Sequence, residues 1–147
     1  MAFKASNVLP ADAYLIIKRG AVQLKANLQG FVTYMAVNDT DYDYLRGVYR
    51  TLERSKTQFD TLKTTAGLAQ YAKDQENDQT YDVVTEFNSL ITTIQAAITW
   101  LDNNIPTNVT AKLPENWGDG TLISNAFTPA QTADLRTTLN AVSAEII

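Results

Sequence analysis

The amino-acid sequence predicts an all-α fold, an antiparallel bundle of about four helices, in a single domain of 147 residues. Apolar residues recur at helical spacing in four segments, and the spacing is strictest between residues 84 and 105. Thr128 and Pro129 form a specific helix-start signal. Between the third and fourth helices, residues 106–127 have no helical period. We expect a long loop there, irregular or containing a hairpin.

The first predicted helix covers residues 10–37 and is apolar on most of its sides. Apolar residues with the spacing of one face are Ala13, Ile17, Leu24, Leu28, Phe31 and Met35, and others occupy the remaining faces, among them Leu15, Val22, Tyr34 and Val37. A helix of this kind is usually enclosed. We therefore expect either that the other helices surround it or that it faces a partner subunit. Gly20 and Gly30 are expected where another backbone comes close.

The second predicted helix covers residues 41–73. Its apolar stripe consists of Leu45, Val48, Leu52, Phe59 and Leu62. The pattern weakens at residues 64–67, Thr-Thr-Ala-Gly, where we expect a kink or a short break. A polar connection at residues 73–80 follows.

The third predicted helix, residues 81–104, has the most regular pattern of the chain. Its apolar residues follow one another at intervals of three and four: Val84, Phe87, Ile91, Ile94, Ile98, Leu101 and Ile105. This heptad spacing is typical of side chains that pack into a neighbouring helix. The neighbour is expected within the same chain, and a coiled coil between subunits is the alternative.

The last predicted helix begins at Thr128, where Thr128, Pro129 and Gln131 form a capping box with proline at the first helical position. One face holds Leu135, Leu139, Val142 and Ile146. Because the sequence closes on two isoleucines, we expect that end to be packed against the bundle.

The composition argues against catalysis and against nucleic-acid binding. The chain has no histidine and no cysteine, so it cannot form a Ser-His-Asp triad, a Cys-His pair or a thiolate metal site. Its net charge is −4, and its Lys and Arg residues form no basic cluster of the kind that binds phosphates. We therefore expect no cofactor and no metal site. We also expect no membrane span, because no apolar run approaches the roughly 20 residues that a bilayer requires.

One acidic pattern has part of the spacing of a calcium-binding loop. Asp39, Asp41 and Asp43 alternate as in an EF-hand loop, but Tyr44 and Arg50 occupy the positions that would need glycine and glutamate. Acidic residues are in any case favoured at a helix N-terminus. We therefore interpret these aspartates as the start of the second helix.

Six residues are candidates for protein contacts. Trp117 lies within the long loop beside Gly118, and Leu113 and Leu122 belong to the two arms of the possible hairpin. Three tyrosines gather near the start of the second helix: Tyr42, Tyr44 and Tyr49. Tyrosine and tryptophan combine apolar area with a polar tip and are enriched at interfaces. The alternative is that the tyrosines form the edge of the core and that the loop buries Trp117.

The segment FTPAQTADLRTTLNAVSAEI, Phe127 to Ile146, resembles the terminal helices of small structural proteins of tailed bacteriophages, and the Thr/Asn-rich composition is similar too. The resemblance implies a non-enzymatic virion component, at the head–tail junction, tail or baseplate, assembled in the host cytoplasm. Its partners would be other virion proteins and further copies of itself in a homo-oligomer. The alternative is a cytoplasmic helical adaptor or regulator that binds one protein partner.

Overall fold

The computed structural model describes residues 9–38, 42–65, 67–76, 83–104 and 128–146. All the regular structure in these residues is helical: α1 is Pro10–Val37, α2 is Tyr42–Leu62, α3 is Leu68–Glu76, α4 is Val83–Asn104 and α5 is Pro129–Ala144. The all-helical class is confirmed. The expected number of helices, about four, is wrong, because the described residues form five. Residues 106–127, the predicted loop, lie outside the described part of the chain.

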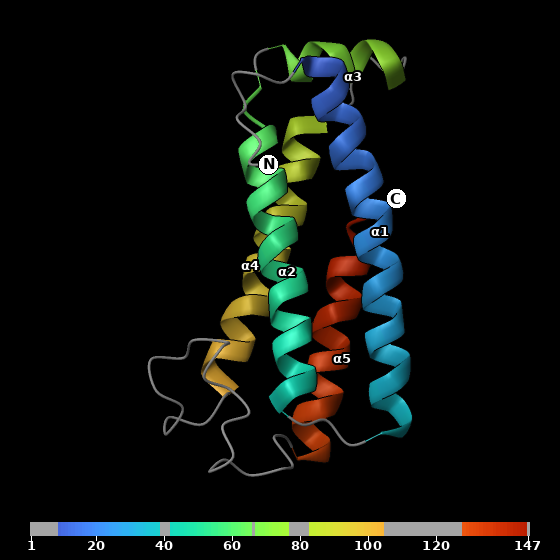
Figure 1. The fold of residues 1–147 in the computed structure, drawn as a ribbon, viewed down its shortest axis with the longest axis vertical. Helices are drawn as coiled ribbons and strands as arrows, with labels where there is room; N and C mark the ends of the chain where they lie inside the picture. The colour runs from blue at the N-terminus through green and yellow to red at the C-terminus, as the bar shows by residue number, and fades with distance from the viewer. Residues whose placement is uncertain (1–8, 39–41, 66, 77–82, 105–127, 147) are drawn as a thin grey trace.

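The additional helix arises where the sequence pattern weakened. The predicted helix 41–73 is divided into α2, which ends at Leu62, and α3, which begins at Leu68. The Thr65 amide donates to the Leu62 carbonyl, and the Leu68 amide donates to the Thr65 carbonyl. Gly67 has φ +80°, a left-handed conformation that glycine adopts without steric cost. The chain thus turns at this point, and α3 lies across one end of the long helices (Figure 1).

The four long helices lie side by side, and each contacts two of the others (Figure 1). α1 packs against α2 and α5, and α4 packs against the same two helices. Consecutive long helices run in opposite directions in Figure 1. In that view α1 forms the right-hand edge of the molecule. It therefore has one side toward the bundle and one side away from it.

The heptad pattern of the third predicted helix corresponds to the buried face of α4. Five of its members are between 0% and 7% exposed in the single chain: Phe87, Ile91, Ile94, Ile98 and Leu101. They belong to one core together with Leu45, Leu52 and Phe59 of α2 and Leu135 and Leu139 of α5. Helices of the same chain therefore cover this face, as the first of the two alternatives predicted.

The start of α5 follows the predicted capping box. The Gln131 amide donates to the Thr128 Oγ1 at 3.2 Å, and the Thr128 amide donates to the Gln131 Oε1 at 3.0 Å. At the other end of the helix Ile146 is only 5% exposed, and its carbonyl accepts a hydrogen bond from the Lys25 Nζ at 2.9 Å. The expected packing is confirmed for Ile146, which links this end of α5 to α1, and Ile147 lies outside the described residues.

The two glycines of α1, Gly20 and Gly30, differ in what surrounds them. A Cβ atom at Gly20 would lie 3.0 Å from the Cε1 atom of the Phe59 side chain, so α1 and α2 are close there, but the neighbour is a side chain and not the backbone that the sequence predicted. A Cβ atom at Gly30 would meet nothing within 4 Å, so the prediction of a close neighbour at Gly30 is wrong within this chain. Gly30 is exposed instead.

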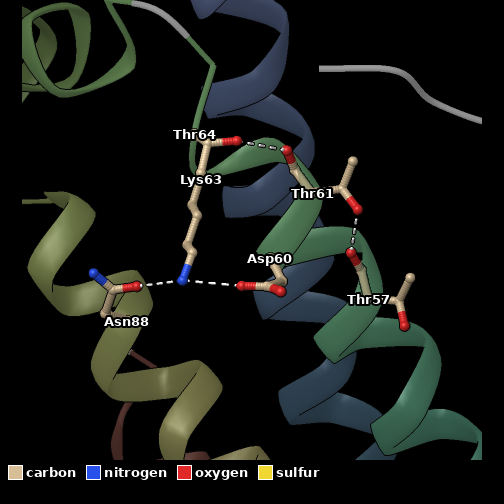
Figure 2. A network of polar contacts seen from close by, with 6 residues as sticks. All are labelled: Thr57, Asp60, Thr61, Lys63, Thr64 and Asn88. Atoms are coloured by element: carbon tan, nitrogen blue, oxygen red, sulfur yellow. Dashed lines mark hydrogen bonds and ion pairs between the residues drawn. The ribbon is translucent and has the colours of Figure 1, made fainter.

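A small polar network joins the end of α2 to α4 (Figure 2). The Lys63 Nζ donates to the Asn88 Oδ1 at 2.7 Å and lies 2.9 Å from the Asp60 Oδ1. The Thr61 hydroxyl donates to the Thr57 carbonyl of the same helix. These contacts are near the surface, where ion pairs add little stability. Their arrangement is that of a structural link between two helices.

Candidate protein-contact surface

α1 has two apolar faces on opposite sides. The buried face includes Ile17, Leu24 and Leu28, each at most 1% exposed. On an α-helix of 3.6 residues per turn, Val22 and Leu24 point about 200° apart. Val22 is 62% exposed, Leu15 is 41% exposed and Val37 is 82% exposed. Large apolar side chains therefore lie on the side of α1 that faces away from the core.

These exposed side chains belong to a continuous stripe along α1. Residues at intervals of four, three, four, four, three and four share this side, and all are exposed: Leu15, Arg19, Val22, Ala26, Gly30, Thr33 and Val37. We call this set the outer stripe. Arg19 is its single charged member, and the rest is apolar, small or a threonine.

The outward side of α2 is of a different kind. Its exposed residues include Glu53, Arg54 and Asp60, which are readily hydrated. Charged residues on the solvent face and apolar residues on the core face are the usual pattern of a surface helix. α1 departs from that pattern although no described helix covers its outer stripe. An exposed run of apolar side chains on a folded protein commonly marks an interaction site.

An aromatic cluster lies beside the stripe, at the end of α1. The rings of Tyr34 and Tyr44 are stacked, with centroids 4.2 Å apart and an interplanar angle of 17°. Phe31 meets Tyr44 edge-on at 5.8 Å. Burial, and secondarily the neighbouring Tyr34, raise the pKa of Tyr44 above its ordinary value of 10.0. Tyr34 remains 40% exposed and extends the apolar surface near Val37.

The candidate contact residues from the sequence occupy different environments. Tyr44 of α2 is half-buried within the aromatic cluster, and its ring contacts Phe31 and Tyr34 of α1. Tyr49 is 9% exposed and belongs to the core, so little of it is available to a partner. Burial raises the pKa of Tyr49, and Asp102 and Glu53 add smaller effects in the same direction. Four candidates lie outside the described side chains: Tyr42, Leu113, Trp117 and Leu122.

The sequence left two alternatives for the further apolar faces of α1, that other helices surround it or that it faces a partner subunit. It places Leu15, Val22 and Val37 on faces of the first helix other than the regularly spaced one, without assigning them to a single surface. The signal was present, because these residues remain once the buried spacing has been subtracted, and they repeat at intervals of three and four. What the pattern could not supply was the number of neighbours of α1, which decides whether a second apolar face is covered.

Two further properties of the described residues bear on function. None of their helices has the length and apolar character needed to cross a membrane. Among the same residues, no three acidic side chains come together in a group that could hold a metal ion. Asp39 and Asp41, two of the three alternating aspartates, are outside the described part of the chain.

Comparisons of the chain with protein-family models, with curated proteins and with solved structures found no significant match. The inference of function therefore depends on the surface of the chain itself, and the outer stripe of α1 is its most distinctive feature.

Proposed function

We propose that this protein is a non-enzymatic structural protein that works through contacts between protein subunits, with the outer stripe of α1 as the contact surface. The observation that supports this is the exposure of Leu15, Val22 and Val37 on a helix whose opposite face fills the core. Burial of apolar area is favourable by about 25 cal/mol per Å². The apolar area of the outer stripe contributes this free energy only when another protein covers it and removes it from water.

The setting that we propose is the virion of a tailed bacteriophage. The support is the resemblance of Phe127–Ile146 to terminal helices of small phage structural proteins, together with a surface rich in Thr, Asn and Gln. Uncharged polar side chains lose less hydration free energy than Lys or Glu when an interface forms. Such a surface suits permanent packing between subunits in a symmetric particle.

A matched pair of lysine variants tests the contact surface. Val22→Lys places a charge in the middle of the outer stripe. Asn27→Lys places the same charge on the same helix, about 140° around from Val22, where Asn27 is exposed and contacts the Gln23 amide. The molar mass of each protein in solution is measured by light scattering after gel filtration, across a dilution series.

We expect the native protein and Asn27→Lys to form an oligomer, and Val22→Lys to have the mass of a single chain, 16.3 kDa. The reason is that an ammonium group buried in an apolar contact without a partner is strongly unfavourable. Equal oligomer masses for the two variants would contradict the role of the stripe. A native protein that remains a single chain at every concentration, and binds one dissimilar protein reversibly, would favour the adaptor instead.

A further inference from the structure

The spacing of the outer stripe is symmetric. From Ala26 the stripe extends by four, three and four residues to Val37, and by the same steps in the other direction to Leu15. A helix laid antiparallel to itself with the two Ala26 residues opposite each other therefore aligns every stripe residue with another stripe residue. The repeat of 11 residues is also close to three helical turns, so the stripe follows the helix axis with little drift.

The sizes of the aligned residues are complementary. The largest exposed side chain near the centre, Val22, would lie opposite Gly30, where a Cβ atom meets nothing within 4 Å. Ala26 would lie opposite Ala26, and small residues allow two helix backbones to come close. At the ends, Leu15 would lie opposite Val37, so two large exposed apolar residues cover each other. In a parallel pair Val22 would instead oppose Val22, and the open space at Gly30 would oppose itself.

The charges favour the same orientation. All the charged residues of α1 lie in its first 16 positions: Asp12, Lys18, Arg19 and Lys25. No charged residue occurs from Ala26 to Asn38. A parallel pair would place Arg19 opposite Arg19, and like charges that face each other repel. In the antiparallel pair Arg19 lies opposite Thr33, whose hydroxyl is uncharged.

We propose that a second copy of this chain covers the outer stripe, and that the two α1 helices pack antiparallel about a two-fold axis at Ala26. This proposal rests on the proposed function, and it adds the partner, the orientation and the register. A two-fold interface of this kind uses the same surface on both copies and closes on itself, which makes the dimer a defined building unit.

The chain contains no cysteine, so single cysteine variants give unambiguous cross-links. Three single cysteine variants test the register: Ala26→Cys, Leu15→Cys and Val37→Cys. Each protein is oxidised mildly with diamide, alone and in mixtures, and covalent dimers are measured on non-reducing gels. A disulfide requires Cα atoms within about 7 Å of each other. Positions 15 and 37 are separated by 22 residues, or roughly 33 Å along a helix, so the orientations are easily distinguished.

In the proposed register, Ala26→Cys forms covalent dimers by itself. Leu15→Cys and Val37→Cys form them only when they are mixed, and the product contains one chain of each. Asn27→Cys, outside the stripe, is the matched control and forms few covalent dimers. Covalent dimers of Leu15→Cys alone would show a parallel pair; they would overturn the proposal and leave the function of the stripe in place.

Two other outcomes separate this proposal from the function on which it rests. An oligomer in solution that Val22→Lys dissociates, but that forms neither the cross-link between two Ala26→Cys chains nor the one between Leu15→Cys and Val37→Cys, would overturn the register only. Absence of any oligomer and of any cross-link, with Val22→Lys as soluble as the native chain, would overturn both.

Discussion

Replacing Val22 by alanine removes two methyl groups from the centre of the outer stripe without adding charge or volume. In the single chain 62% of this side chain is exposed, so most of the apolar surface that the substitution removes is surface that a dimer would cover. The substitution therefore affects association far more than folding.

The size of the effect follows from the exposed fraction. Two methyl groups contribute about 1.6 kcal/mol on complete burial, of which the exposed part amounts to about 1 kcal/mol per chain. Because the two-fold axis places Val22 in the interface twice, the dimer loses about 2 kcal/mol. Since about 1.4 kcal/mol corresponds to a factor of ten, the dissociation constant of the dimer should rise about 30-fold.

Folding of the single chain should change by no more than about 0.5 kcal/mol, because surface substitutions on a helix generally have small effects and alanine is the better helix former. Sedimentation equilibrium gives the dissociation constant, and urea unfolding at a concentration below it gives the free energy of unfolding. A dissociation constant equal to that of the native protein would refute the assignment of Val22 to an interface. A large loss of unfolding free energy would show that Val22 is covered within its own chain.

Three further predictions concern the fold and are checked by urea unfolding. Gly47→Ala should stabilise the protein by about 1 kcal/mol, because alanine is the better helix former and its Cβ atom would meet nothing within 4 Å. Gly20→Ala should stabilise it less or destabilise it, because its Cβ atom would lie 3.0 Å from buried Phe59. Equal increases in unfolding free energy for the two variants would contradict the close approach of α1 and α2. Thr128→Ala should cost about 1 kcal/mol by removing the capping hydroxyl, and no loss would contradict the capping box. Because the pKa of Tyr44 is raised in the folded chain, the unfolded chain releases this phenol proton at a lower pH, and the free energy of unfolding should decline as the pH rises past 10. The free energy of unfolding of Tyr44→Phe should decline less steeply over the same pH range. An identical decline in the two proteins would contradict the raised pKa.

Much of the helical framework was predictable because local chemistry decides it. The apolar spacing around Ile94 predicted a buried helix face, and Ile94 is fully buried in α4. The capping box at Thr128 predicted the first residue of α5, because side chain and backbone satisfy each other within four residues. Such signals need no knowledge of the distant parts of the chain.

The features that the sequence left open or predicted wrongly depend on contacts with distant parts of the chain. The sequence predicted a kink or a short break at residues 64–67, and the structure shows the break. Whether α3 then turns away is decided by what it packs against, such as Tyr14, whose ring meets Tyr71 edge-on at 5.7 Å. Gly20 and Gly30 are equivalent in the sequence, yet only Gly20 faces α2. The sequence likewise left open whether other helices or a partner subunit cover the further apolar faces of α1, and the structure shows that no described helix covers the outer stripe.

Reactivity at position 22 tests most directly whether another copy covers the outer stripe. Val22→Cys and Asn27→Cys are alkylated with a maleimide at a series of protein concentrations, and the rates are compared. Both positions are exposed in the single chain, so dilute samples should react at similar rates. As the concentration rises, the thiol at position 22 should become protected while the thiol at position 27 remains reactive. A rate at position 22 that stays high at every concentration would contradict the covering of the stripe by a second copy.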